Sequence, residues 1–485
     1  MSLLKPASRH QFMLPSSLDE YVSEDNIVRF IDAFADKVTT ISKISYSKGT
    51  KDTGRSAYPF PVLLKIYIYG YLNSISSSRK LENECLRNME MIWLIGNLHP
   101  DHKTISDFRK DNKEDIRRCT LEFRKFLKEQ SYISGTTVVT DGSKIKAYAS
   151  RDTLSLNTIN QRIERIASEI EKYLNQLEEN DASESFDEHL ADLSDDLGVE
   201  TALLEKIASL QSKIDLLEQQ KKQIEDSGHD HLAPADPDAR LMKTRQGFLP
   251  AYNVQSTVDT KHHFIIQFDV TDHHVDYYDL QTNVEAIKEQ IDIIPKEVLG
   301  DGGYANEDQI QHLEGEGIKC FIPFTENSRK EEDKKKGIVF KYDEKEDCFI
   351  CPQNKKLVLI GNHKKRDKLY NKYQAKNCND CPLKPQCTKS KIGRIIYKRV
   401  EDKWLKEYKE KLTTPEYKKK IKERKTFVEH PFGTIKYWMG QIPLLLRGKE
   451  KVQAELDLYS TCYNLKRFLN IENRQLALQK IQNWE

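Results

Sequence analysis

Three short segments of this chain each place a carboxylate beside an apolar run. They contain Asp141, Asp301 and Glu429, which are far apart in the sequence. Two aspartates and one glutamate brought together would suit Mg²⁺, which takes oxygen ligands. Two such ions about 4 Å apart can hold both the attacking and the leaving oxygen of a phosphodiester displacement. The three segments together therefore predict a two-metal phosphodiester site, although an Asp-Gly pair taken singly also fits a turn or a helix cap.

The elements around these carboxylates must bring them to one place. Asp141 and Asp301 each follow a buried strand, so we expect both at carboxyl ends of strands, where open α/β sheets place their sites. Glu429 precedes Pro431, which is tolerated in the first turn of a helix but breaks a helix interior. We therefore expect Glu429 at or just before a helix that runs to about Gly440. A surface ion-pair cluster is the alternative for this segment.

Basic residues flank the third carboxylate. Lys436 lies seven residues after Glu429, on the same face of a continuous helix, and Arg424 lies upstream. The net charge of the chain is only +1, but residues 391–425 hold 14 Lys and Arg against 6 Asp and Glu. Such clustering is the footprint that phosphate backbones require, so we predict DNA contacts there, including Lys418, Lys419 and Lys420. A solvated helix face is the alternative.

The surrounding pattern predicts a mixed α/β sheet with helices packed on it. Strands are expected at 252–258, 263–270 and 317–323, and helices at 277–291 and 306–315. Residues 131–154 and 227–325 would supply the first parts of this catalytic domain. Residues 401–485 would supply a basic helical segment and its C-terminal part.

A helical hairpin is predicted between the first two parts. Apolar residues recur at spacings of three and four from Ile159 to Leu177 and again from Ile207 to Ile224. Residues 173–205 contain no Lys or Arg, and Gly198 lies in the acidic connection. Residues 155–226 therefore read as an antiparallel coiled coil. It can pack on itself or mediate dimerisation.

Residues 1–130 are predicted to be helical. Two helix starts carry Ser or Thr together with basic side chains, which suits contacts to DNA. The candidate DNA-binding residues are Arg79, Lys80, Thr104, Ser106, Arg109 and Lys110. The same pattern fits a helix-turn-helix reader of DNA and an ordinary helical bundle equally well.

Five of the nine cysteines lie within forty positions, in residues 326–400. Their spacing is C-x2-C, a gap of 26 residues, and then C-x2-C-x5-C. Paired thiolates at this spacing suit tetrahedral Zn²⁺, and unmetallated or redox-sensitive thiols are the alternative. We expect four ligands, with Cys348 left over because it lies in an apolar run. The expected ligands are Cys351, Cys378, Cys381 and Cys387.

Several stretches together resemble DDE transposases of bacterial insertion sequences, in the subgroup with an InsH-type N-terminal domain and a Cys-rich insertion. The resemblance covers nearly the whole length. It is carried by residues 104–109, 141–145, 236–240, 252–255, 301–304, 424–436, 447–448 and 464–465.

The resemblance implies a ribonuclease-H-like catalytic domain in which Asp141, Asp301 and Glu429 bind two Mg²⁺ or Mn²⁺ ions. It assigns Arg424 and Lys436 to the same site as contacts to phosphate. It leaves a tyrosine role open, because Tyr417 lies seven residues before Arg424. The implied reaction cuts a strand at the element end and transfers the 3′-OH to target DNA.

The implied partners are the terminal repeats and target DNA, with a homodimer in the DNA complex. Two other functions remain open, a ribonuclease-H-like nuclease that does not join strands and a DNA-binding protein that has lost catalysis. No run of 18 apolar residues and no signal-peptide pattern is present, so we expect a cytoplasmic protein, associated with the nucleoid when it is bound to DNA.

Overall fold

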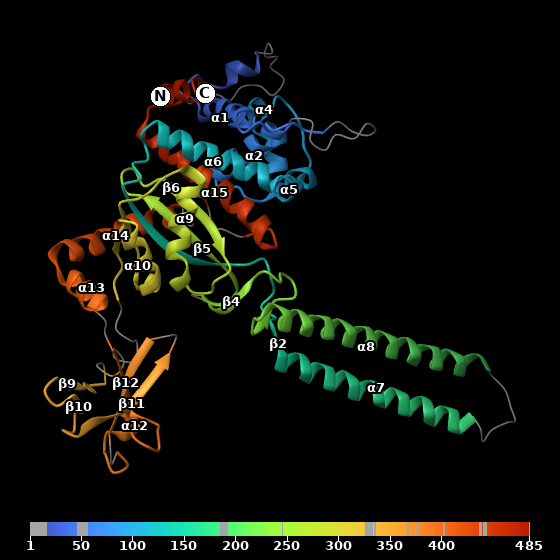
Figure 1. Cartoon of the computed structure of the whole chain (residues 1–485). Coiled ribbons are helices and arrows are strands. Elements are labelled where there is room, and N and C mark those ends of the chain that lie inside the picture. Colours follow the sequence, from blue (N-terminus) through green and yellow to red (C-terminus); the bar gives the residue numbers. More distant parts are fainter. Residues whose placement is uncertain are drawn as a thin grey trace, which may run out of the picture.

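The computed structural model describes residues 17–45, 57–184, 193–244, 246–324, 333, 336–365, 368–375, 378–400, 403–435, 439 and 444–484. A helical region and a mixed sheet form the body of the molecule, and two parts project from it (Figure 1). One projection is a long helical hairpin, and the other is a small antiparallel sheet. No helix among these described ranges is long and apolar enough to cross a membrane.

The central sheet has six strands of mixed direction, which confirms the predicted α/β class. Their order is β4-β5-β1-β7-β8, and β6 also pairs with β5. β1 runs antiparallel to β5 and parallel to β7. The strands are β1 (Thr137–Lys146), β4 (Arg240–Thr244), β5 (Gly247–Asp259), β6 (Ile265–Thr271), β7 (Glu297–Leu299) and β8 (Lys319–Phe321). The helices between them are α9 (Leu280–Ile291) and α10 (Glu307–Gly315).

The N-terminal region is a set of helices that packs against the end of the chain. Its elements are η1 (Leu18–Tyr21), α1 (Ile27–Ile41), α2 (Phe60–Leu72), α3 (Ser78–Arg87), α4 (Met89–Leu94), α5 (His102–Asp111) and α6 (Lys113–Glu129). Helices α15 (Lys449–Ile471) and α16 (Arg474–Gln482) complete this region. α16 packs on α1, while α15 packs on α2, α5 and α6.

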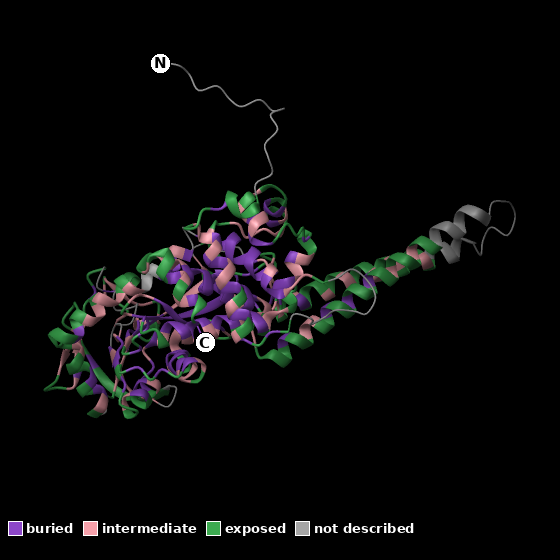
Figure 2. Cartoon of the chain, turned by 90° about the horizontal axis from the view of Figure 1, so that it is seen from above, coloured by how far each residue is buried: buried purple, intermediate pink, exposed green. Residues whose placement is uncertain are grey.

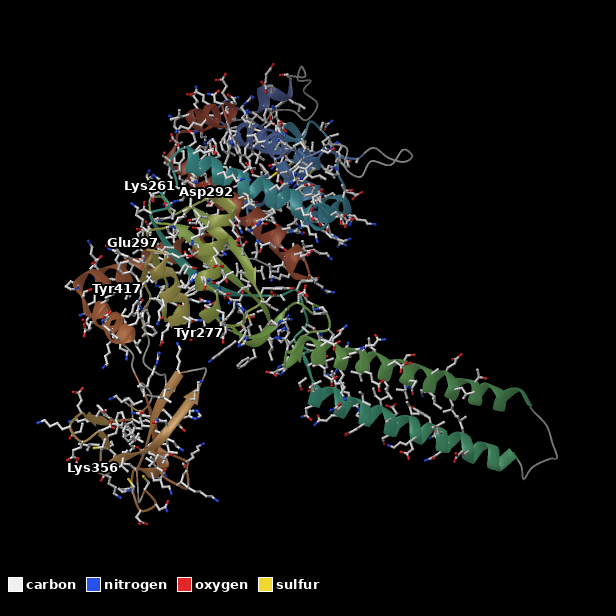
Figure 3. All side chains as sticks on the ribbon, in the orientation of Figure 1. Lys261, Tyr277, Asp292, Glu297, Lys356 and Tyr417 are labelled. Atoms are coloured by element: carbon white, nitrogen blue, oxygen red, sulfur yellow. The ribbon has the colours of Figure 1, made fainter. Side chains whose placement is uncertain are left out.

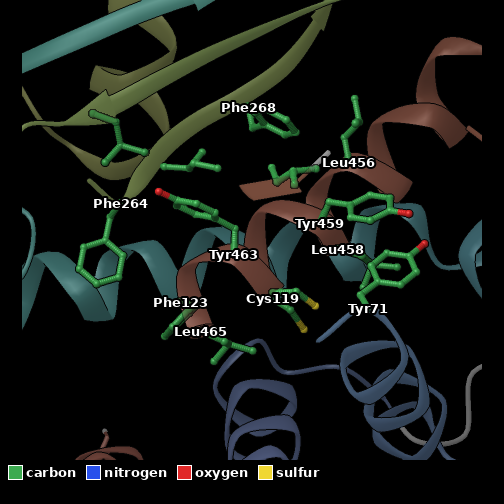
Figure 4. Close-up of a cluster of buried hydrophobic side chains, with 14 of the residues drawn as sticks. Tyr71, Cys119, Phe123, Phe264, Phe268, Leu456, Leu458, Tyr459, Tyr463 and Leu465 are labelled. Carbon is green, nitrogen blue, oxygen red and sulfur yellow. The ribbon is translucent and has the colours of Figure 1, made fainter. Parts of the chain in front are cut away.

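α15 joins the helical region to the sheet, because it also packs on β6. Its side chains are buried on all sides, as expected of a helix between two layers. In the close-up, Leu458 and Leu465 lie toward the N-terminal helices, and Tyr463 lies toward the strand that carries Phe268 (Figure 4). The buried residues of both regions form one continuous hydrophobic core (Figure 2).

The helical hairpin consists of α7 (Leu156–Glu184) and α8 (Leu193–Ser227). At its base, β2 (Leu154–Ser155) pairs with β3 (His231–Leu232). Buried apolar residues concentrate near this base, where Ile159 packs with Leu217 and Ile224. The hairpin projects from the body of the molecule, with exposed residues along much of its length (Figures 1 and 2).

The second projection is a five-stranded antiparallel sheet, in the order β13-β12-β11-β10-β9. Its strands are β9 (Lys341–Asp343), β10 (Cys348–Ile350), β11 (Lys356–Lys365), β12 (Lys368–Ala375) and β13 (Ile395–Arg399), with α12 (Lys384–Cys387) before the last. Glu307 on α10 forms ion pairs with Lys368 and Arg399, which ties this sheet to the body. Helices α13 (Lys403–Thr413) and α14 (Pro415–Gly433) then return the chain to the central sheet.

Candidate active site

Asp141 lies in the middle of β1, not at its end as expected. β1 continues to Lys146, and Asp141 is opposite Ser256 of β5 in the antiparallel register. The parallel pairing with β7 stops earlier, at Val139 and Leu299. β1 therefore extends beyond its neighbour, and Asp141 is placed where β7 ends, because β5 alone supports the strand from there on.

Asp301 follows β7 by two residues and lies at the start of a short 3-10 helix, η3 (Gly302–Tyr304). Its carboxylate Oδ1 accepts a hydrogen bond of 2.7 Å from the Gly303 backbone N–H. This fixes one oxygen of the carboxylate and the direction of the loop. Because β7 is the parallel neighbour of β1, the two aspartates come together at one edge of the sheet.

α14 brings Arg424 to the first of these carboxylates. The guanidinium Nη1 of Arg424 lies 3.7 Å from Asp141 Oδ1, and the two side chains are 15% and 25% exposed. Burial and the charge of Asp301 raise the pKa of Asp141 to about 7, and the nearby Arg424 charge lowers it by less. Two carboxylates held close and partly buried repel each other, and a bound cation removes that repulsion.

The helix that carries Glu429 begins earlier than expected. α14 runs from Pro415 to Gly433 with Pro431 inside it, so Glu429 lies near the C-terminal end of this helix and not at the start of one. Pro431 lies in the last turn of α14, where its missing N–H removes one backbone hydrogen bond of the helix. The side chain of Glu429 and the whole of Lys436 lie outside the described residues. The structure therefore places the Glu429 backbone on the helix that also carries Arg424, five residues before it.

Asp276 is a further carboxylate at this edge that the sequence did not reveal. It lies in η2 (Asp276–Tyr278), and its Oδ1 accepts hydrogen bonds from Asn253 Nδ2 at 2.8 Å and Gln255 Nε2 at 2.9 Å. A Cβ atom added to Gly142 would lie 2.2 Å from the same oxygen. Glycine after Asp141 is thus required by the close approach of Asp276. That glycine was the only signal in the sequence.

A buried polar network supports the site from behind. Asn283 on α9 donates to Thr140 Oγ1 at 2.8 Å and to Gln255 Oε1 at 3.0 Å, and the Tyr304 hydroxyl donates to the same Gln255 oxygen. These residues flank Asp141, Asp276 and Asp301 in the sequence or across the sheet. Satisfied buried networks of this kind hold side chains in one arrangement.

Tyr417 and Asp236 each have a structural role in the fold. The Tyr417 hydroxyl donates to the Cys320 carbonyl, and its ring packs 4.6 Å from that of Phe321, where α14 meets the sheet (Figure 3). Asp236 is fully buried and accepts hydrogen bonds from the Tyr252 hydroxyl and the Gly448 N–H. It thereby anchors the start of α15.

The candidate DNA-binding residues of the N-terminal region divide into two groups. Arg79, Lys80 and Lys110 are exposed, while Thr104 and Ser106 are half-buried. α5 begins at His102, and Asp101 caps it by accepting a hydrogen bond of 2.7 Å from the Thr104 N–H.

Arg109 is a correction to the expected DNA surface, since its side chain is 1% exposed. Its Nη1 donates to the Tyr71 hydroxyl at 2.9 Å and lies 3.6 Å from Glu455 on α15. DNA cannot reach a guanidinium enclosed in this way. Arg109 instead joins α5 to the last long helix.

The basic residues of α14 also differ from one another. Lys418 and Lys419 are exposed, but Lys420 forms an ion pair with Glu297 at the start of β7. Glu297 and Tyr417 mark the contact between α14 and the sheet in Figure 3. Lys420 therefore helps to dock the helix that carries Arg424.

The four cysteines expected to bind zinc line one small cavity of about 30 Å³. The Lys355 N–H donates to Cys351 Sγ at 3.3 Å. Cys348 is buried on β10 and is not among the lining residues. Across the described parts of the chain, however, no three Cys, His, Asp or Glu side chains are arranged as a metal-binding group.

Two protein-family models match the chain. One is described as "Transposase domain (DUF772)" and matches residues 16–111, and the other is described as "Transposase DDE domain" and matches residues 350–469. No curated protein and no solved structure matches. The second match includes Arg424 and Glu429, and the first includes the helices expected to read DNA. Matches to transposase models in both the N-terminal and the C-terminal part of the chain indicate a DDE transposase of an insertion sequence.

Proposed function

We propose that this transposase binds the ends of its element, cuts a phosphodiester bond there and transfers the resulting 3′-OH strand to target DNA. The observation that carries the proposal is the convergence of Asp141, Asp301 and Arg424 at one sheet edge, with Glu429 on the same helix as Arg424. The sheet order, with β1 between antiparallel β5 and parallel β7, supports a ribonuclease-H-like catalytic domain.

The aspartate pair is suited to divalent cations. Both groups offer the oxygen ligands that Mg²⁺ and Mn²⁺ prefer, and burial together with the charge of Asp301 raises the pKa of Asp141. Asp141, Asp301 and Glu429 would hold two ions, which would activate the attacking oxygen and stabilise the leaving one. Arg424, 3.7 Å from Asp141, would hold a phosphate oxygen with its planar fork. Lys436 is assigned a similar contact on the basis of the family resemblance alone.

DNA would extend from this site over basic surfaces. Lys418 and Lys419 are exposed on α14, the helix that carries Arg424, and Arg79, Lys80 and Lys110 are exposed on the N-terminal helices. Exposed cations of this kind contact phosphates and position the duplex without reading its sequence. We further propose that the DNA complex is a homodimer, so that two element ends are processed together.

The small sheet is proposed to hold one structural Zn²⁺ ion. The cavity shared by Cys351, Cys378, Cys381 and Cys387 and the N–H bond to the Cys351 sulfur support this assignment. A tetrahedral thiolate site would fix the loops that carry these residues.

Strand transfer of a labelled element end in Mg²⁺ tests the catalytic proposal. We expect the wild type to cut and join, and Asp301→Ala to do neither, while binding of the end persists. Activity that survives Asp301→Ala would contradict the site assignment. Cutting without any joined product would indicate a nuclease, and DNA binding without cutting would indicate a protein that has lost catalysis.

A further inference from the structure

A pocket of about 450 Å³ lies beside the carboxylates and has no role in the reaction described so far. We refer to it as the tyrosine pocket. It is lined by Lys144, His274, Val275, Asp276, Tyr277, Tyr278 and Gly303. Figure 3 shows Tyr277 at the end of the central sheet that faces the small antiparallel sheet. A volume of this size is typical of pockets that bind small ligands.

The tyrosine pocket shares a wall with the catalytic edge. A Cβ atom on Gly303 would lie 2.8 Å from Asp301 Oδ1 and 3.5 Å from Asp276 Oδ2, so this residue borders both carboxylates. Gly303 follows Asp301 by two residues, a reach of at most about 7 Å. In duplex DNA each strand advances roughly 3.4 Å per nucleotide. A strand with a phosphate at Asp301 therefore brings its neighbouring nucleotides to the pocket.

The chemistry of the lining suits a nucleotide. The rings of Tyr277 and Tyr278 lie 5.0 Å apart at an interplanar angle of 85°, and Tyr278 is 40% exposed. Aromatic faces of this kind stack on bases, whatever the base. Lys144 reaches the same pocket, with its Nζ 3.8 Å from Asp276 Oδ2. An ammonium beside the rings supplies the charge that the phosphate of a bound nucleotide needs.

The loop that carries the two tyrosines is held in place. Asp279 is 1% exposed and accepts hydrogen bonds of 2.7 Å from Thr271 and from the His273 ring. The Tyr278 carbonyl accepts from Gln309 Nε2 at 2.8 Å. A platform fixed in this way loses little conformational entropy when a base stacks on it.

We infer that the tyrosine pocket holds the base of one unpaired nucleotide next to the scissile phosphate, stacked on Tyr277 or Tyr278 with its phosphate toward Lys144. This inference rests on the proposed function, since it assigns a nucleotide-binding role beside the same carboxylates. A base held there would fix the position of the adjacent phosphate against Asp141 and Asp301.

Single-turnover cleavage of labelled element ends in Mg²⁺ tests the inference. The substrates carry either an intact nucleotide or an abasic one at each position flanking the scissile phosphate. The protein variants are the double change Tyr277→Ala with Tyr278→Ala, and the double change to Phe, which keeps both rings. Phe248→Ala is the matched control, because Phe248 is an aromatic residue that is 67% exposed on the β4–β5 hairpin and does not line the pocket.

At one flanking position we expect loss of the base to lower the wild-type cleavage efficiency roughly 5- to 150-fold, the range of base stacking on an aromatic side chain. The double Ala variant should lose the same factor on intact DNA and nothing more on the abasic substrate. The double Phe variant and Phe248→Ala should match the wild type. The inference would be overturned if the double Ala variant showed no loss on intact DNA. It would also be overturned if the loss from the abasic substrate and the loss from the double Ala variant multiplied when the two were combined.

The outcomes also separate this inference from the proposed function. A wild type that binds the ends without cutting them contradicts the proposed function itself. If the wild type cuts the ends and the double Ala variant cuts them equally well, only the pocket assignment is contradicted.

Discussion

Replacing Asp141 by Asn should stabilise the metal-free protein at pH 8 while it destroys catalysis. Burial and the neighbouring Asp301 raise the pKa of Asp141 from 3.8 to about 7. One pKa unit corresponds to about 1.4 kcal/mol, so an ionised Asp141 costs the folded state up to about 4 kcal/mol. The side chain keeps 25% exposure, which lets solvent screen part of this cost. We expect D141N to raise the free energy of unfolding by about 2 to 4 kcal/mol.

The increase in the free energy of unfolding caused by D141N should grow as the pH rises. Between about pH 4 and pH 7 the folded chain keeps a proton on Asp141 that the unfolded chain has released. The wild-type free energy of unfolding therefore falls as pH rises through this window and levels off above pH 7. The D141N chain lacks this component, so its advantage over the wild type is largest at pH 8 and vanishes toward pH 4.

Urea unfolding in EDTA, followed by the fluorescence of the four tryptophans, measures this difference. At pH 8 the D141N midpoint should exceed that of the wild type. Millimolar Mg²⁺ should raise the wild-type midpoint and leave that of D141N unchanged, because the cation needs the carboxylate. Asp308→Asn, at a side chain that is 81% exposed, is the matched control for the chemical change. A D141N advantage that stays constant between pH 5 and pH 8 would refute the reasoning.

Other changes test the remaining contacts. Arg424→Lys keeps the charge but loses the planar fork, so single-turnover cleavage should fall roughly 10- to 100-fold; a rate equal to the wild type would show that no bidentate contact forms. Arg109→Ala leaves Glu455 buried without its partner and should cost roughly 3 to 5 kcal/mol in urea unfolding, whereas Lys110→Ala, at the exposed neighbour, should stay within about 0.5 kcal/mol. Cys381→Ser should remove a bound zinc ion, measured as metal content per chain, and Cys348→Ser should retain it; equal zinc in both would move Cys381 out of the site.

The sequence predicted those residues of the candidate site that are marked by their immediate neighbours in the chain. Asp141 and Asp301 each stand beside an apolar run and a glycine, and Arg424 lies in a basic stretch, so residue type and order predicted that these three side chains lie near one another, as they do in the structure. Asp276 carries no such signal, because it is placed by hydrogen bonds from β5 that only the folded sheet creates. The mixed sheet was predictable from the alternation of strands and helices, whereas the end of β1 was not, since β5 supports it beyond β7.

Two predictions failed for reasons that can be stated. Arg109 follows Ile105 by four residues, so both lie on the same face of α5, and that face is buried against α15. Its charge suggested DNA, but its helical position indicated the core. The start of the Glu429 helix was misplaced because a proline was read as a beginning. In the structure Pro431 lies near the end of α14 instead, a helix that runs to Gly433, so it does not mark the start of a helix.

The position of α15 has a consequence for how the chain acquires its structure. The helices made first, such as α2 and α6, pack on a helix that the ribosome makes more than 300 residues later. Their apolar faces therefore stay uncovered during most of translation, until α15 has been synthesised. Contacts between residues so distant in sequence also form slowly. We expect the nascent N-terminal region to depend on holding chaperones, and chains truncated before residue 449 to aggregate. Assembly of the sheet edge that carries Asp141 and completion of the N-terminal helical region would then occur as one late event.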